Sequence, residues 1–228
     1  MERSLIIAMI SSMKEKVYNT ILQRIISLAY LPGEKISEKN LSEELNIGRT
    51  PIREAILQLR EEGLIKSVPQ SGTYISKINL QKAKDARFLR ESVETKIIQE
   101  SIAKLNEYDL MVLQQIIDRQ KLEVRTTHDD MRFFELDEQF HHYFYKATGR
   151  DQVWRWLQMS NMQLNRFRVL RLRSKSLSWE TLVDEHEELL EAVTEKKTSK
   201  ATKLISSHLH RMLTEEPTLR QDYADYFE

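Results

Sequence analysis

The sequence contains no cysteine. This absence excludes disulfide bonds, cysteine-ligated zinc sites and thiol catalysis, and it is in keeping with a reducing cytoplasm. Only five glycines and four prolines occur in 228 residues, which argues against long irregular regions and favours a mainly helical chain. The early apolar run Leu5–Ile10 is far too short to span a membrane. We therefore expect a cytoplasmic protein with no membrane partner.

Neither sign of charge is in excess. The chain has 35 lysines and arginines and 35 aspartates and glutamates, so its formal net charge is zero. Net charge thus gives no support for a nucleic-acid partner, and any basic surface must be local. Most prolines and glycines fall in residues 30–72, and strand-like segments occur only there. This shift in composition predicts an N-terminal domain over 1–78 and an all-helical domain over 79–228.

The N-terminal segment follows the order of a winged helix-turn-helix. Apolar periodicity predicts helices over residues 13–28 and Glu38–Leu45. Ser37 is a suitable N-cap for the second, and Asn46 can adopt the left-handed conformation that ends a helix. In "GRTPIREAILQLREEG", Thr50 is expected to be the N-cap of a third helix that ends at Gly63. The β-prone runs "LIKSV" and "TYISK" then predict a hairpin, the wing.

Two arginines lie at the start of the third predicted helix. Arg53 falls on the face opposite the apolar stripe, and Arg49 precedes the cap. An arginine at the start of an exposed helix can donate two hydrogen bonds to guanine in the major groove. Lys39 and the wing segment Gln70–Gly72 are suited to DNA backbone or minor-groove contacts. Alternatively, the arginines are ordinary solvated charges, a reading that the surrounding cap, proline and wing make less favourable.

The stretch "PGEKISEKNLSEELNIGRTPIREAILQLREEGLIKSVPQSGTYI" resembles the DNA-binding domain of the GntR superfamily of bacterial transcription regulators. The resemblance is nearly continuous from Val17 to Ile75. It implies binding to double-stranded DNA with an inverted-repeat operator. The positions that it places at the DNA are Lys39, Gly48, Arg49, Thr50, Arg53 and Gly72. Relatives often have a hydroxyl residue at position 48, so a phosphate bound there would need a backbone N–H donor.

Beyond residue 80 the sequence reads as successive amphipathic helices, and their inward faces carry histidines. The predicted spans are 81–104, 107–125, 129–148, 151–173, 178–196 and 198–215. Asp137 and His141 share one face in "ELDEQFHHYF", because residues four apart on a helix point the same way. His186 and His208 lie on the apolar stripes of two later helices, whereas His142 and His210 fall off these faces.

One aspartate and three histidines are therefore expected to project into one antiparallel bundle. Each alone is more often a hydrogen-bonded core residue than a ligand. Together, Asp137, His141, His186 and His208 suit a divalent transition metal such as zinc, nickel or manganese. Four protein ligands of an octahedral set would leave two positions for water or a small molecule.

The segments "LDEQFHHYFYKATG", "DEHEELLEAV" and "SSHLHRM" resemble the metal-binding effector domain of the FadR branch, the FCD domain. The resemblance covers residues 80–215 and implies an all-helical fold that binds small organic acids at an Asp, His, His, His metal site. Six predicted helices would place the chain in the shorter, VanR-like group. Arg90 falls where this family often has a pocket arginine. Asn165 and Arg168 are further candidates for the effector, although these arginines could instead be solvated or paired with Glu91, Glu94 or Glu187.

Three functions remain open at this point. The first is a homodimeric transcriptional regulator, a repressor by family resemblance, whose DNA affinity responds to an organic acid at the metal. The second keeps the regulator but makes the metal purely structural. The third is a metal-dependent hydrolase. No independent general base is expected at the site, because Glu138 and Glu185 should point away, so an enzyme is the least favoured reading.

Overall fold

The computed structural model describes residues 2–228, with side chains from Met13 onward. The chain divides into two compact units. One comprises Met1–Asn79, of which Met1 lies outside the described residues, together with Tyr223–Glu228. The other comprises Leu80–Asp222. Nothing in the sequence pattern indicated that the last six residues pack with the first unit.

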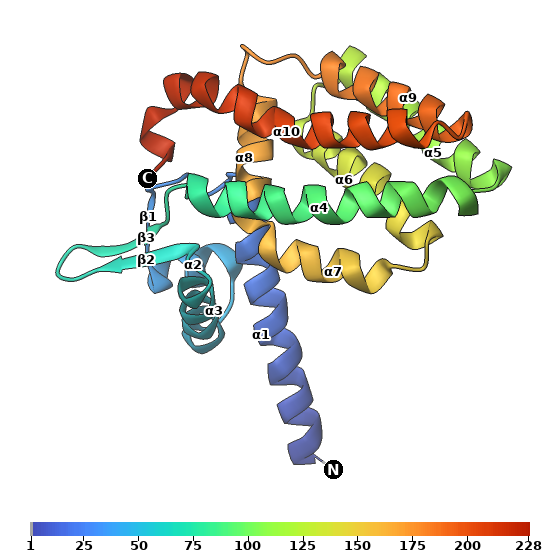
Figure 1. Cartoon of the computed structure of the whole chain (residues 1–228). Coiled ribbons are helices and arrows are strands. Elements are labelled where there is room, and N and C mark those ends of the chain that lie inside the picture. The colour runs from blue at the N-terminus through green and yellow to red at the C-terminus, as the bar shows by residue number, and fades with distance from the viewer. Residues whose placement is uncertain (1) are drawn as a thin grey trace. The chain divides into compact units, whose positions relative to one another are not determined.

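Three helices build most of the first unit: α1 (Glu2–Ile26), α2 (Glu38–Leu45) and α3 (Arg49–Glu61) (Figure 1). Helix α2 has the predicted bounds and caps. The Ser37 hydroxyl accepts a hydrogen bond from the Asn40 N–H at 3.1 Å, and Asn46 ends the helix with a φ of 52°. Helix α3 packs against both α1 and α2, so it is held by the core along one side.

Helix α3 begins two residues earlier than expected. Gly48 is its N-cap and makes no side-chain cap hydrogen bond, and Arg49 is its first residue. The prediction of Thr50 as N-cap is therefore wrong. Glycine is tolerated as an N-cap, and Pro51 still lies in the first turn, where its missing N–H costs no helical hydrogen bond. The predicted buried stripe is confirmed, and it consists of Ile52, Ala55, Ile56 and Leu59.

The wing is a three-stranded antiparallel sheet in the order β1-β3-β2. Strands β2 (Ile65–Val68) and β3 (Gly72–Ile75) form the predicted hairpin. Strand β1 (Lys35–Ile36) pairs with β3 and was not predicted, since two residues are too few to show a strand period.

The C-terminal segment completes this unit. After the 3₁₀ turn η1 (Ala224–Tyr226), Phe227 forms a parallel bridge with Ile78 and is buried. The Ile78 N–H donates to the Tyr226 carbonyl at 2.8 Å, and the Glu228 N–H donates back to the Ile78 carbonyl at 3.2 Å. The last residues of the chain thus belong to the first unit.

The second unit is a bundle of antiparallel helices (Figure 1). Its described helices are α4 (Leu80–Lys104), α5 (Glu107–Arg125), α6 (Asp130–Ala147), α7 (Asp151–Ser160), α8 (Met162–Arg173), α9 (Glu180–Thr194) and α10 (Thr198–Asp222). The single helix predicted over 151–173 is wrong, because buried Asn161 separates α7 from α8. The six predicted spans thus become seven helices. Helix α10 also continues past 215, through Pro217.

Helices α4 and α5 organise the bundle. Helix α4 packs against α10, α8 and α6, and α5 packs against α6 and α9. The interior of the bundle is an apolar core rich in phenylalanine. Several charged side chains are buried in the same interior, among them Arg90, Glu94, Asp137 and Arg171. Because burying a charge is costly unless it is paired, these residues identify the part of the bundle that needs a chemical explanation.

Candidate functional site

The predicted DNA-reading residues lie on the exposed side of the first unit. Arg49, Thr50 and Arg53 are all exposed in the first turn and a half of α3, opposite the buried stripe. Among the described residues, neither Arg49 nor Arg53 has an ion-pair partner within 4.0 Å, so both guanidinium groups are available for a ligand. Lys39, exposed on α2, lies 3.9 Å from Glu43.

Gly72 stands at the start of β3 with a φ of 144°. A Cβ atom at this position would lie 2.6 Å from the Lys35 side chain. A residue with a side chain is therefore disfavoured by the backbone conformation, whereas the flexible end of the Lys35 side chain can move aside. The wing turn needs this glycine whether or not DNA contacts it.

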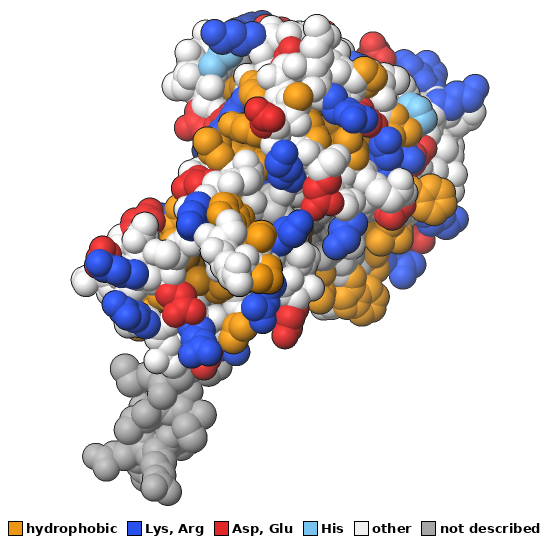
Figure 2. Space-filling view, turned by 90° about the vertical axis from the view of Figure 1, so that its left-hand side faces the viewer, with side chains coloured by type: hydrophobic (Ala, Val, Ile, Leu, Met, Phe, Trp, Pro, Cys, Tyr) orange, Lys and Arg blue, Asp and Glu red, His pale blue; other side chains and the backbone are white. Residues whose placement is uncertain are grey.

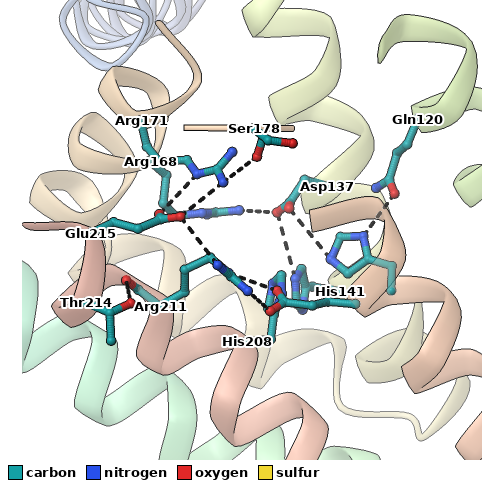
Figure 3. Close-up of polar contacts among 12 residues, drawn as sticks. Gln120, Asp137, His141, Arg168, Arg171, Ser178, His208, Arg211, Thr214 and Glu215 are labelled. Carbon is teal, nitrogen blue, oxygen red and sulfur yellow. Dashed lines mark hydrogen bonds and ion pairs between the residues drawn. The ribbon is translucent and has the colours of Figure 1, made fainter. Parts of the chain in front are cut away.

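The four predicted metal ligands come together in the bundle. Asp137 and His141 project from α6, His186 from α9 and His208 from α10. One ligand atom from each lies within 4.8 Å of the others. The Nε2 atoms of His141 and His186 are each 3.8 Å from an oxygen of Asp137. Figure 3 shows the cluster with its polar contacts.

Each histidine is oriented by a different partner on its Nδ1 atom. His141 Nδ1 lies 2.8 Å from Glu94, His186 Nδ1 lies 2.9 Å from the side-chain oxygen of Gln120, and His208 Nδ1 lies 2.8 Å from Glu185. Because all three partners accept, Nδ1 carries the proton and donates in each ring. The Nε2 lone pairs are then left for a ligand. This pairing is the usual way in which proteins orient metal-binding histidines.

The residues present therefore fit a divalent metal. Among the described atoms, His141 Nε2 and His186 Nε2 are buried and have no hydrogen-bond partner. Buried polar atoms are rarely left unpaired, and here two of them face the same carboxylate. Nitrogen and oxygen donors of this kind suit zinc, nickel or manganese. Asp137, His141, His186 and His208 are the residues that would hold the ion.

The electrostatics keep the cluster in its ligating form. Burial alone would raise the pKa of Asp137, but the guanidinium group of Arg168 holds that pKa well below its usual range. Burial lowers the pKa of His186 well below its usual value, and the neighbouring His208 lowers it further. Burial likewise lowers the pKa of His141, against the opposing effect of Glu94. A metal site needs an ionised carboxylate and neutral imidazoles.

We predict that Gln120→Leu will weaken metal affinity by about 10–100-fold, the usual cost of losing such an orienting partner. The substitution leaves the buried His186 Nδ1–H without an acceptor while keeping the size of the side chain. A chelator-competition titration measures the change. Gln114→Leu is the matched control, because Gln114 is an exposed residue of the same helix that bonds only its neighbour Asp118. Equal affinities in both variants would show that Gln120 has no orienting role.

A cavity adjoins the cluster and includes Asp137 and His208 in its lining. Arg90 and Arg168 also line it. Arg90 is fully buried and bonds Glu94 at 2.6 Å, one of the ion pairs considered as an alternative for this residue. Arg168 contacts both Asp137 and Glu138 and stacks on Phe134. Asn165 accepts a hydrogen bond from Arg168 at 2.9 Å, so it supports Arg168 and is not itself part of the cavity lining described.

Several site residues were missed or misplaced by sequence reasoning. Glu94 was considered only as an ion-pair partner of the arginines, and Gln120 was not considered, because the histidines that they orient lie on other helices. The expectation that Glu138 and Glu185 point away from the site is wrong. Glu138 reaches Arg168 at 2.6 Å, and Glu185 binds His208. The predicted outward positions of His142 and His210 are confirmed by their exposure.

Two family models match the chain. Residues 13–75 match the bacterial regulatory proteins of the gntR family, and residues 85–211 match the FCD domain. A transcriptional regulator in an unstable DNA locus of Streptomyces ambofaciens is 29% identical over 94% of this chain and 89% of its own length. The transcriptional repressor RspR of Escherichia coli is 26% identical over 93% of this chain and 92% of its own length.

Solved structures agree on the fold. The McbR/YncC protein of Escherichia coli superposes with a TM-score of 0.73 at 17% identity, covering 92% of this chain and 98% of its own. The matched families and relatives are transcriptional regulators, which are not enzymes. The hydrolase reading is thereby set aside. Among the described residues, no helix is long and apolar enough to cross a membrane.

Proposed function

The chain is a transcriptional regulator of the GntR family with an FCD domain, and from this premise we propose that it is a repressor controlled by a metabolite. A small organic acid binds beside a divalent metal in the bundle and changes the affinity of the winged helix for its operator. The orientation of the three histidines carries this proposal, because each has Nδ1 engaged by a partner and Nε2 left for a ligand. The metal would supply a Lewis-acidic position for a carboxylate oxygen.

A purely structural metal is the alternative that this proposal must exclude. A structural site is normally closed by its protein ligands, and it requires no cavity beside it. Here a cavity borders two of the four candidate ligands, Asp137 and His208. Apolar and aromatic side chains line it together with a few charged groups, which is the pattern of sites for small molecules. The adjoining cavity favours a metal site that binds an effector over a purely structural metal site.

The DNA-binding part of the proposal is tested by selecting sequences from random double-stranded DNA with the purified full chain. We expect enrichment of an inverted repeat whose half-sites are separated by about one helical turn or a multiple of it, as two symmetry-related reading helices require. Enrichment of no sequence, or of a single asymmetric site, would contradict a dimeric winged-helix regulator.

The homodimer is proposed to form through helices α4 and α7, which are neighbours in the bundle. Phe88 on α4 is 67% exposed, and Trp156 and Met159 on α7 are 62% and 72% exposed. Figure 2 shows hydrophobic side chains reaching the surface along the right-hand side of the molecule. Large exposed apolar side chains gathered on adjacent helices are typical of a protein interface.

We predict that Trp156→Glu will convert the dimer to a monomer, because a carboxylate buried at an apolar interface has no partner. Light scattering coupled to size-exclusion chromatography measures the mass. Leu122→Glu is the control, since Leu122 is 59% exposed on α5, away from this helix pair. A Trp156→Glu protein that keeps the dimeric mass would place the interface elsewhere.

A further inference from the structure

The cavity beside the metal cluster is lined partly by apolar side chains and partly by arginines. Half of its lining is apolar and comes from four helices, α6, α8, α9 and α10. These residues are Phe133, Phe134, Leu164, Phe167, Leu172, Leu182, Leu209 and Met212. Such walls favour a ligand with a hydrophobic body, because apolar surface gains by leaving water. A ligand covered with hydroxyl groups would lose hydrogen bonds to water against them.

The remaining lining is dominated by arginines, and most of these already have their own carboxylates. Arg87 pairs with Glu91, and Arg90 pairs with Glu94. Arg211 pairs with Glu185. Arg171 donates two hydrogen bonds of 3.1 Å to Glu215 and one to the Ser178 carbonyl. These contacts appear in part in Figure 3. Four of the five guanidinium groups are thus held by glutamates that are not candidate metal ligands.

Arg168 differs from the other four. Its ion pairs are with Glu138 and with Asp137, and Asp137 is the carboxylate of the metal cluster. A metal ion and Arg168 would therefore share one carboxylate. Arg168 is the cation whose pairing is most open to exchange for a carboxylate from a ligand, and its planar group suits that contact.

The charges around the cavity can be counted from these pairs. Five arginines face six carboxylates, so the residues together carry one net negative charge when the histidines are neutral. The carboxylates are Glu91, Glu94, Asp137, Glu138, Glu185 and Glu215. A divalent cation changes this to one net positive charge. One carboxylate on the ligand brings the site to neutrality, whereas two would leave it negative in a poorly solvated space.

Unpaired donors at the cavity support the same assignment. Among the described atoms, Arg90 Nη2 and Arg171 Nη1 are buried and have no hydrogen-bond partner. Both side chains line the cavity, and they are only 1% and 5% exposed. The oxygens of one carboxylate can accept several hydrogen bonds, so one such group can serve Arg168 and a neighbouring unpaired donor.

We propose that the cavity takes a monocarboxylic acid with a hydrophobic body, and this inference rests on the proposed function of acid sensing at the metal. The carboxylate lies at the metal end beside Arg168, and the body lies against the phenylalanine and leucine walls. Dicarboxylic acids and polyhydroxylated acids are discriminated against, the first by charge and the second by desolvation.

The test compares three acids of equal carbon number on the zinc-loaded full chain by isothermal titration calorimetry. Hexanoate is expected to bind at least about tenfold more tightly than adipate, the scale of a one-charge mismatch at an effective dielectric constant of about 20. It is also expected to bind more tightly than gluconate. Tighter binding of adipate or gluconate would overturn this inference and leave acid sensing intact. Binding of none of the three would overturn this inference and count against acid sensing as well.

A variant tests whether the charge of the site, and not the shape of the cavity, sets the preference among the acids. Glu138→Gln removes the negative charge that pairs with the cavity residue Arg168 at 2.6 Å, and Glu138 is not a candidate metal ligand, so we expect the variant to shift the preference toward adipate by about tenfold. Glu135→Gln, an exposed neighbour on α6, is the matched control and should keep the preference for hexanoate. The same acid preference in Glu138→Gln and in Glu135→Gln would refute the charge argument.

Discussion

Replacing Arg53 with alanine is expected to abolish most of the sequence preference of the protein and to weaken operator binding by about 1–3 kcal/mol per half-site, the usual value of a good bidentate contact to a base. The reason lies in the position of the side chain. Arg53 is exposed, it has no ion-pair partner among the described residues, and it stands on the side of α3 opposite the buried stripe. The substitution touches no core contact, so folding should be unaffected.

Fluorescence anisotropy with the selected operator and with scrambled DNA of equal length measures both effects. Arg60→Ala is the matched control. Arg60 is exposed in the last turn of the same helix, and its loss changes the net charge by the same amount. Arg60→Ala should lower affinity for the two DNAs about equally, if at all, because a charge that meets only phosphates carries no sequence information. An unchanged ratio of operator to scrambled affinity in Arg53→Ala would show that α3 is not the reading helix.

Removing two of the histidine ligands is the second change with a large expected effect. The double variant His186→Ala, His208→Ala should fall from about one bound metal ion per chain to none, since two of four ligands are lost. Metal analysis after purification without chelator gives the stoichiometry. A thermal shift on adding zinc gives a second readout, because an ion that binds only the folded chain raises its stability. The thermal shift of the wild type should be absent in the variant.

The control for this variant also removes two histidines. His142 contacts Asp151 at 2.6 Å near the surface, and His210 is exposed. His142→Ala, His210→Ala should retain the full metal content. Circular dichroism checks that both proteins remain helical, because His186 is fully buried against Phe140 and its loss leaves a small cavity. A folded His186→Ala, His208→Ala protein that keeps its metal would show that the ligands have been misassigned.

The parts of this architecture that depend on local pattern could be predicted from the sequence. Ser37 and Asn46 mark the ends of α2 through their own side-chain and backbone preferences. Asp137 and His141 were paired through helical spacing alone. The four ligands meet in space because each lies on the inward stripe of its helix, and that stripe is readable residue by residue.

Other features depend on contacts between elements, and the sequence pattern does not record these. Glu185 lies off the apolar stripe of α9, so the helical pattern does not place it at the site. It contacts His208 because α9 and α10 pack side by side. Gln120 is an ordinary polar residue until its helix is placed beside His186. No glycine or proline near Asn161 indicates that one helix ends there and another begins. The bridge between Ile78 and Phe227 joins segments on either side of the whole helical bundle in the sequence, so no local signal could indicate it.

The most direct test of the account is the operator affinity of the full chain, measured with and without bound zinc and with and without hexanoate. We predict that hexanoate changes operator affinity in the zinc-loaded protein and leaves it unchanged in the demetallated, still folded protein. Coupling between sites is reciprocal, so saturating operator DNA should shift the affinity for hexanoate by the same factor. An equal response to hexanoate in the demetallated protein would contradict the claim that the metal cluster is where this regulator senses its ligand.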